Sequence, residues 1–245
     1  MLLNYLEPSF HLGPLTIHLY GMALAVAIIA GLFLALHSAS TKKIKTDLIW
    51  ELSTYCIIGA VIGARLFSVA LHFDKFLANP LYLFQVHEGG LAFYGGLIGG
   101  ALVGYFYLRR KKLSFWRVAD IYAPALAMGE AITRLGCDVY GFASSTAPWP
   151  RITNGIAYHN IPLYMFVASM LLFALLWFLR NKVRQGQLFL IYLAGYFAVR
   201  VFIDYFRSEP GYGIFNQAQL AGLILFVAVL IVIYFRDKSL VGIKQ

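Results

Sequence analysis

Seven long apolar runs follow one another along the chain, separated by short polar or basic stretches. A helix needs about 20 mainly apolar residues to cross the hydrocarbon core of a bilayer. The runs that approach this length are 15–37, 48–73, 91–108, 115–136, 161–179, 187–206 and 216–235. The pattern predicts an all-α integral membrane protein with seven transmembrane helices, in a single polytopic domain over residues 1–245. Residues 1–14, which contain Pro8 and Pro14, are expected to lie on the membrane surface.

Basic residues are distributed unevenly among the loops between these runs. The loops after the first, third, fifth and seventh runs hold fourteen Lys and Arg residues, counting Arg117, whereas the other loops hold three. Lys and Arg accumulate in the cytoplasmic loops of membrane proteins. The distribution therefore predicts an N-terminus outside the cell and a cytoplasmic C-terminus.

The composition agrees with a membrane protein, because 60% of the residues are hydrophobic and only 13% are charged. Soluble domains have roughly 45–50% apolar and 25% charged residues. Most of the net charge of +9 lies in short loops, so we interpret it as a topology signal and expect no nucleic-acid partner. Cys56 and Cys137 have no metal-binding spacing, and we expect no structural disulfide. The N-terminus lacks a basic segment and a small-residue cleavage site, so we expect no cleaved signal peptide.

Ionisable residues occur inside several apolar runs. Glu130 and Arg134 are four residues apart, which places both side chains on one face of a helix, and Arg200 and Asp204 share this spacing. Charged residues inside a membrane are costly and usually mark a paired, functional or water-filled site. The alternative is a pair that only fixes helix packing.

Three arginines, Arg65, Arg134 and Arg207, fall near the outer ends of their runs in the predicted topology. Arginine binds phosphate through two parallel hydrogen bonds and is less strongly hydrated than lysine. If the three converge, they would suit an anionic lipid headgroup. For Arg207 the alternative is an interfacial side chain that extends towards water and has no binding role.

A glycine-rich stretch covers residues 87–100 and begins the third run. Gly95 with Gly99, and Gly96 with Gly100, have the spacing that allows close helix packing. Tyr94 falls about one turn inside the outer interface, where an aromatic-belt role is the simpler explanation. Beside a cationic group, its phenol could instead orient or deprotonate a nucleophile.

Short segments of the chain, in a fixed order, resemble the prolipoprotein diacylglyceryl transferase family of bacterial inner-membrane enzymes. They are Tyr20-Gly21, residues 63–66, residues 88–99, Arg134-Leu135-Gly136, Leu163-Tyr164, residues 199–210, and Gln217 or Gln219. The resemblance covers most of the chain, and seven spans with an external N-terminus also fit the family.

The resemblance implies a reaction. The diacylglyceryl group of phosphatidylglycerol moves to the thiol of a lipobox cysteine in a preprolipoprotein signal peptide, a thioether forms, and glycerol phosphate leaves. It implies no cofactor and no metal, a location in the bacterial plasma (inner) membrane, and a site towards the outer leaflet of the bilayer. The site residues expected to be catalytic are Tyr94, Arg134 and Arg207. Those expected to bind substrate are Tyr20, Arg65, Gly95, Gly96, Gly136 and Gly141.

Four positions depart from the family pattern. Tyr94 stands where the family usually has His, Cys137 where it has Asn, and Phe142 and Met165 where it has Glu. These differences favour a second hypothesis, a non-catalytic paralogue that binds anionic lipid. A small transporter is a third hypothesis, but the chain lacks the internal repeat and paired broken helices typical of many transporters.

Overall fold

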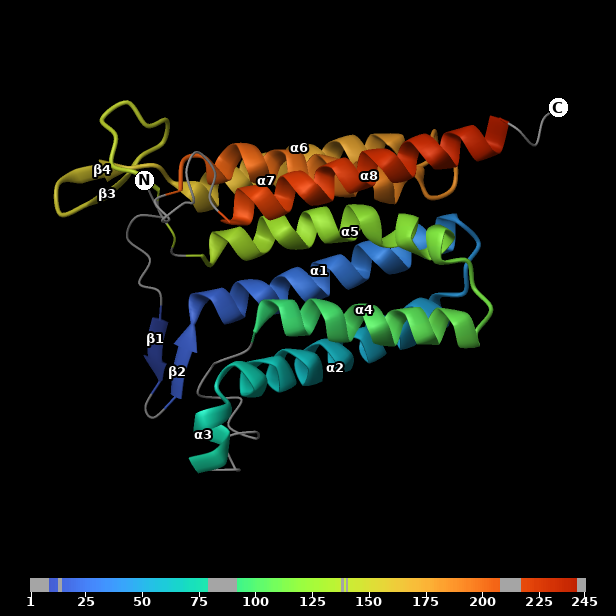
Figure 1. Ribbon diagram of the computed structural model, residues 1–245, viewed down its shortest axis with the longest axis horizontal. Helices are drawn as coiled ribbons and strands as arrows, with labels where there is room; N and C mark the ends of the chain where they lie inside the picture. Colours follow the sequence, from blue (N-terminus) through green and yellow to red (C-terminus); the bar gives the residue numbers. More distant parts are fainter. Residues whose placement is uncertain are drawn as a thin grey trace. The chain divides into compact units, whose positions relative to one another are not determined.

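The computed structural model describes residues 9–12, 15–78, 92–137, 139, 141–207 and 217–241 (Figure 1). Helices dominate these residues, with two short antiparallel hairpins beside them. The helices are α1 (Leu19–Thr41), α2 (Thr46–Leu71), α3 (Phe73–Ala78), α4 (Phe93–Arg110), α5 (Phe115–Leu135), α6 (Ile161–Leu179), α7 (Gln187–Asp204) and α8 (Gln217–Val241). The hairpins pair β1 (Ser9–Leu12) with β2 (Leu15–His18), and β3 (Arg151–Thr153) with β4 (Ile156–Tyr158).

Five helices in the described part of the chain are long and apolar enough to cross a membrane: α1, α2, α6, α7 and α8. This confirms a helical, multi-pass membrane protein. The predicted third and fourth runs are also helical, as α4 and α5, but they are less apolar. Helix α4 ends in Arg109 and Arg110, and α5 carries four charged residues, Arg117, Asp120, Glu130 and Arg134.

The predicted start of the first span was wrong. Residues 15–18 form strand β2, and helix α1 begins at Leu19 and continues to Thr41. Apolar and polar residues alternate through Leu15-Thr16-Ile17-His18, which is the two-residue period of a strand. The bounds of α6 match the prediction at both ends, and α8 extends to Val241, beyond the predicted end at 235. Residues 88–91 and 208–210, which carry part of the family resemblance, lie outside the described residues.

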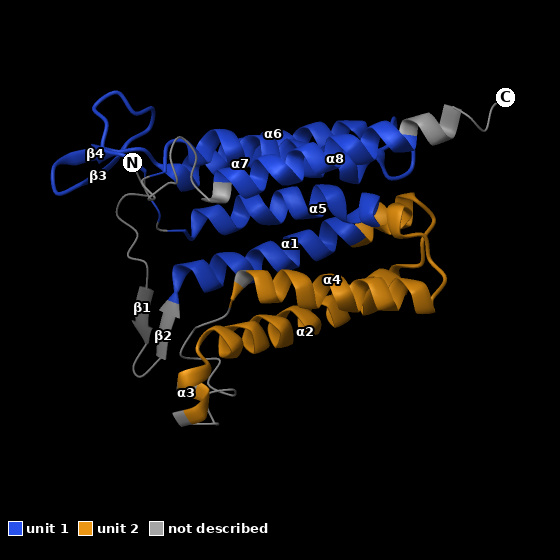
Figure 2. Cartoon of the chain, viewed as in Figure 1, with its two compact units in different colours: residues 1–35, 119–245 blue, residues 36–118 orange. Residues whose placement is uncertain are grey.

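The chain divides into two compact units, shown in different colours in Figure 2. Unit 1 comprises residues 1–35 and 119–245, and unit 2 comprises residues 36–118. Helices α1 and α5 each contribute residues to both units. A single polytopic domain over the whole chain remains a prediction.

Unit 2 is held together by glycine contacts between α2 and α4. A side chain added at Gly95 would overlap the carbonyl oxygen of Gly63, and one added at Gly99 would overlap that of Gly59. The backbone N–H of Ala92 donates to the carbonyl of Ala64 in α2, at 3.2 Å. Backbones this close require glycine, because small residues are what allow membrane helices to pack without intervening side chains.

Unit 1 has an apolar core between α5, α6 and α7. Its buried members are Ala123, Ala127, Leu172, Leu176 and Leu188. A buried carboxylate adds a directional contact, because Asp120 of α5 accepts hydrogen bonds from the backbone N–H groups of Gly186 and Phe189, the latter at 2.9 Å.

This contact caps the start of α7 from a neighbouring helix. The first N–H groups of a helix have no partner within it, and the helix dipole favours an anion there. Asp120 therefore fixes the start of α7 against α5. This contact therefore also sets the alignment of the charged residues further along the two helices.

The glycine contacts lead to a test within unit 2. Gly99→Ala should lower the thermal stability of the protein in detergent, because the added methyl meets the α2 backbone, with Gly63 Cα at 2.9 Å. Overpacking of this kind typically costs about 1–3 kcal/mol. Gly100→Ala is the matched control, because its nearest neighbour, the Cys56 carbonyl oxygen, lies at 3.2 Å and requires only a small shift. Equal melting temperatures for the two variants would contradict the close glycine packing.

Candidate functional site

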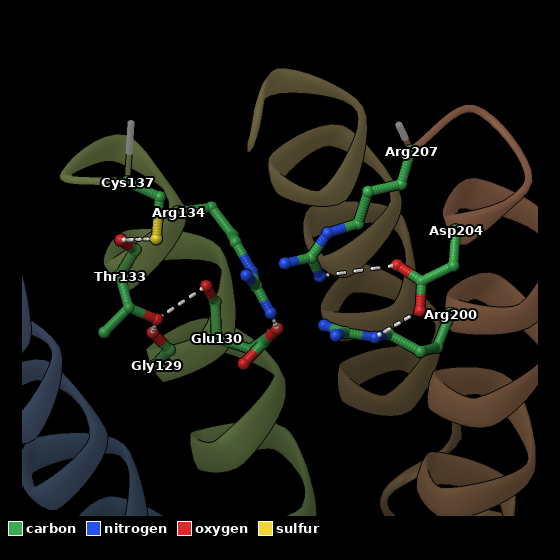
Figure 3. Close-up of polar contacts among 8 residues, drawn as sticks. All are labelled: Gly129, Glu130, Thr133, Arg134, Cys137, Arg200, Asp204 and Arg207. Carbon is green, nitrogen blue, oxygen red and sulfur yellow. Dashed lines mark hydrogen bonds and ion pairs between the residues drawn. The ribbon is translucent and has the colours of Figure 1, made fainter. Parts of the chain in front are cut away.

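The C-terminal end of α5 carries an internal ion pair. Arg134 Nε donates to Glu130 Oε1 at 2.9 Å, and a second guanidinium nitrogen of Arg134 contacts the same oxygen (Figure 3). The side chains of both residues are 21% exposed. The predicted pairing of Glu130 with Arg134 is confirmed, and the pair is partly exposed.

The C-terminal end of α7 carries a second ionic group. Arg200 Nε donates to Asp204 Oδ2 at 2.8 Å, as the four-residue spacing predicted. Arg207, just beyond the helix, places a guanidinium nitrogen 3.9 Å from the other oxygen, Asp204 Oδ1. Because the Asp204 side chain is only 2% exposed, a single buried carboxylate fixes both arginines.

The two ionic groups face each other. In Figure 3 the guanidinium groups of Arg134, Arg200 and Arg207 all extend into the space between α5 and α7. Tyr196 of α7 is within electrostatic range of both ionic groups, through Glu130 and Arg134 on one side and Arg200 and Asp204 on the other. Three guanidinium groups meet two carboxylates in this arginine cluster (Glu130, Arg134, Arg200, Asp204 and Arg207), so its net charge is positive.

Gly136 brings the start of α1 to the arginine cluster. A Cβ atom on Gly136 would lie 2.7 Å from the Ala23 side chain and 2.8 Å from the Leu19 carbonyl oxygen and from Tyr20 Cα. Tyr20 is close enough to interact electrostatically with both Arg134 and Glu130. The glycine is therefore needed for the close approach of α1 to the end of α5, which brings Tyr20 within electrostatic range of the ion pair.

Gly141 attaches the loop after α5 to the segment that ends in Arg207. It forms a β-bridge with Arg207, and a side chain on it would overlap the Phe206 carbonyl oxygen. The neighbouring Phe142 N–H donates to that same carbonyl at 3.0 Å. A glycine at position 141 thus holds the backbone of Arg207 against the loop.

Unit 1 therefore gathers five of the predicted site residues: Tyr20, Arg134, Gly136, Gly141 and Arg207. The other four belong to unit 2. Arg65 is buried within α2, whereas Tyr94 is 66% exposed at the start of α4. Gly95 packs against Gly63, and Gly96 lies with its Cβ direction 3.3 Å from the Ala60 carbonyl oxygen, so both glycines serve helix packing.

Arg200 and Tyr196 were not predicted as site residues. Arg200 had been expected only to pair with Asp204, and Tyr196 had not been singled out. The spacing contained a signal, because Tyr196, Arg200 and Asp204 recur every four residues and so share one face of a helix. The spacing does not identify the neighbour that this face approaches, which is the end of α5.

Cys137 lies just beyond α5, beside Arg134. Its thiol donates to the Thr133 carbonyl at 3.5 Å, and burial raises the pKa of the Cys137 thiol despite the nearby guanidinium. Since the thiolate is the reactive form, Cys137 is protonated and poorly nucleophilic near neutral pH.

Alkylation kinetics test this assignment. A small maleimide should modify Cys137 slowly at pH 7 and progressively faster as the pH rises above 9, because ionisation of the thiol is displaced upward. Cys137→Ser is the control that reveals any modification of Cys56, and intact-mass spectrometry gives the rates. Rapid modification of Cys137 at pH 7 would contradict a buried, protonated thiol.

The fold and the arginine cluster together define a multi-pass helical membrane protein with a cationic site at the ends of two helices. Comparison with known proteins agrees with this class. The family model for prolipoprotein diacylglyceryl transferase matches residues 8–235, which is most of the chain. The chain belongs to the prolipoprotein diacylglyceryl transferase family.

Several relatives in this family span nearly the same length. A phosphatidylglycerol–prolipoprotein diacylglyceryl transferase of Trichormus variabilis is 30% identical over 94% of this chain and 90% of its own length. The enzyme of the same name from Bacillus cytotoxicus is 31% identical over 94% of this chain and 92% of its own. That of Listeria welshimeri is 32% identical, covering 95% and 91%.

Proposed function

We propose that this protein transfers the diacylglyceryl group of phosphatidylglycerol to the thiol of a lipobox cysteine in preprolipoproteins. A thioether forms between the cysteine sulfur and the glyceryl carbon, and glycerol phosphate leaves. The proposal joins the family membership of the chain to the chemistry of the arginine cluster in unit 1.

The observation that carries the proposal is the arrangement of Arg134, Arg200 and Arg207 around two carboxylates. Glu130 and Asp204 hold the three guanidinium groups in place, yet they leave one positive charge unbalanced. Such a cluster favours a phosphodiester as its ligand. As the carbon–oxygen bond breaks, negative charge grows on the leaving phosphate, and preorganised guanidinium donors stabilise that charge.

The protein is proposed to act in the bacterial plasma membrane, with seven spans, an external N-terminus and the site towards the outer leaflet. The asymmetry of basic residues among the loops supports this orientation. Three of the four charged residues that make α5 less apolar have such a place: Glu130 and Arg134 belong to the cluster, and Asp120 caps α7, so structural and functional requirements account for most of its polar composition. A site at this depth suits a lipid and a signal peptide that both arrive from within the bilayer.

The remaining predicted residues take supporting roles in the proposal. Tyr94, at the position where the family usually has His, is assigned to orient the acceptor thiol, because a phenol is a weaker base than imidazole near neutral pH. Tyr20 and Arg65 are assigned to the lipid substrate. The four glycines, Gly95, Gly96, Gly136 and Gly141, are assigned to the close backbone contacts that position the substrate-binding side chains.

The second candidate function is a non-catalytic protein that binds anionic lipid. Met165 favours it, because this residue stands where the family usually has Glu and is 1% exposed in an apolar cluster with Ile161 and Ile203. An ionised carboxylate would be costly at that point. The local packing has therefore adapted to the absence of the charge.

The activity is tested with purified protein, phosphatidylglycerol and a lipobox peptide, by mass spectrometry of the modified cysteine. Wild-type protein should form the diacylglyceryl thioether. Arg134→Gln should lower the rate by roughly 10²–10³-fold, which is the usual loss when a donor to a developing oxyanion is removed. Arg134→Lys should be intermediate, because it keeps the charge opposite Glu130 but loses the two-pronged geometry. Tyr94→Phe should lower the rate less than Arg134→Gln.

Arg110→Gln is the matched control, because Arg110 is an exposed arginine at the far end of α4 and should leave the rate unchanged. Equal rates for wild type and Arg134→Gln would contradict the proposed site. A wild-type protein that retains phosphatidylglycerol but forms no product would favour the lipid-binding alternative.

A further inference from the structure

His159 is built into the same small backbone network that holds Arg207. Its carbonyl accepts from Gly141 N–H at 2.8 Å, and its own N–H donates to the Phe142 carbonyl at 3.0 Å. Gly141 in turn bridges to Arg207, and Phe142 N–H donates to the Phe206 carbonyl. Three segments distant in sequence, at 141–142, 159 and 206–207, are therefore fixed side by side.

The imidazole of His159 lies over the residue that precedes Arg207. The ring centroids of His159 and Phe206 are 4.9 Å apart, and the His159 side chain is half-buried. The ring is therefore held by packing against Phe206, the residue before Arg207, and it is only partly covered.

The hydrogen bonds around the ring determine which nitrogen carries the proton. The Tyr164 hydroxyl has one proton, and it donates that proton to the Pro148 carbonyl at 2.6 Å. His159 Nδ1 lies 3.1 Å from the same hydroxyl oxygen, so Nδ1 must be the donor in this contact. A neutral imidazole protonated at Nδ1 has its lone pair at Nε2. We assign this tautomer from the hydrogen-bond network.

We propose that Nε2 of His159 accepts the proton of the acceptor thiol in the transfer reaction. This inference rests on the proposed function. The thiol S–H bond breaks and its proton passes to Nε2. The sulfur then forms a bond to the glyceryl carbon as the carbon–oxygen bond to phosphate breaks. The proton finally leaves the imidazolium for the departing glycerol phosphate or for water, which returns the neutral ring.

The sequence supplies a chemical reason for a proton-accepting role of His159. Tyr94 stands where the family usually has His, so a proton acceptor suited to neutral pH has to come from elsewhere. His159 combines such a side chain with an orienting partner on Nδ1, the arrangement that directs a histidine base towards its substrate. Backbone hydrogen bonds and ring packing join His159 to the segment that carries Arg207, one of the groups proposed to hold the phosphate.

The test compares substitutions at His159 and at its orienting partner in the full-length protein. His159→Gln should lower the rate of thioether formation by at least 10²-fold, the lower end of the usual contribution of a general base. Tyr164→Phe removes the hydroxyl that accepts from Nδ1 and should lower the rate about tenfold, less than loss of the imidazole itself. Both variants should retain phosphatidylglycerol as wild type does, measured by native mass spectrometry. His72→Gln and Tyr234→Phe are matched controls and should leave the rate unchanged.

Chemical rescue separates a base from a structural residue. In His159→Ala, added imidazole should restore product formation in proportion to its concentration, and it should not restore Arg134→Gln. If the wild-type protein is active and His159→Gln keeps its rate within twofold, the inference is overturned while the proposed function stands. Loss of lipid binding in His159→Gln, or no rescue of His159→Ala, would assign His159 a structural role instead. A wild-type protein that forms no product would overturn both proposals.

Discussion

Guanidinium groups at the ends of apolar helices require anionic partners, and this constraint organises unit 1. An unpaired charge removed from water is so costly that each arginine must find a counter-ion or remain hydrated. Glu130 supplies the counter-ion for Arg134, and Asp204 supplies one for both Arg200 and Arg207. Each of these pairs is local to α5 or to the end of α7, and two carboxylates serve three arginines, so the charges are stabilised without neutralising the cluster. The ion pairs therefore leave an excess of positive charge, which an anionic ligand can use.

Backbone contacts set the position of this charge more rigidly than side-chain packing could alone. Asp120 fixes the start of α7 against α5, which aligns the acidic and basic residues towards the far ends of the two helices. Gly136 allows α1 to approach, and Gly141 holds the segment of Arg207. A catalytic group must be placed to within a fraction of an ångström to be effective, and fixed backbone provides that precision. The loop segments at Cys137, Gly141 and His159 are therefore part of the proposed site.

The helices and the two ion pairs could be predicted from the sequence because both depend on local periodicity. Apolar runs define the helices, and a four-residue spacing puts Glu130 beside Arg134 and Arg200 beside Asp204. Strand β2 was missed because its apolar residues merged with those of α1, although its alternation was visible. The roles of Asp120, Tyr196 and His159 could not be predicted, since each depends on a partner from another helix or loop that no local pattern identifies. The family resemblance identifies site residues but not their geometry. For this reason Arg200 was not among the predicted site residues.

The arginine cluster of unit 1 is proposed to recognise the phosphate of an anionic lipid. Native mass spectrometry of the purified protein can test it directly, by comparing retention of phosphatidylglycerol with that of a diacylglycerol bearing the same acyl chains. The wild-type protein should retain phosphatidylglycerol preferentially, and Arg134→Gln combined with Arg200→Gln should reduce that preference at least tenfold. Equal retention of the two lipids by the wild-type protein, or an unchanged preference in the double variant, would contradict the account.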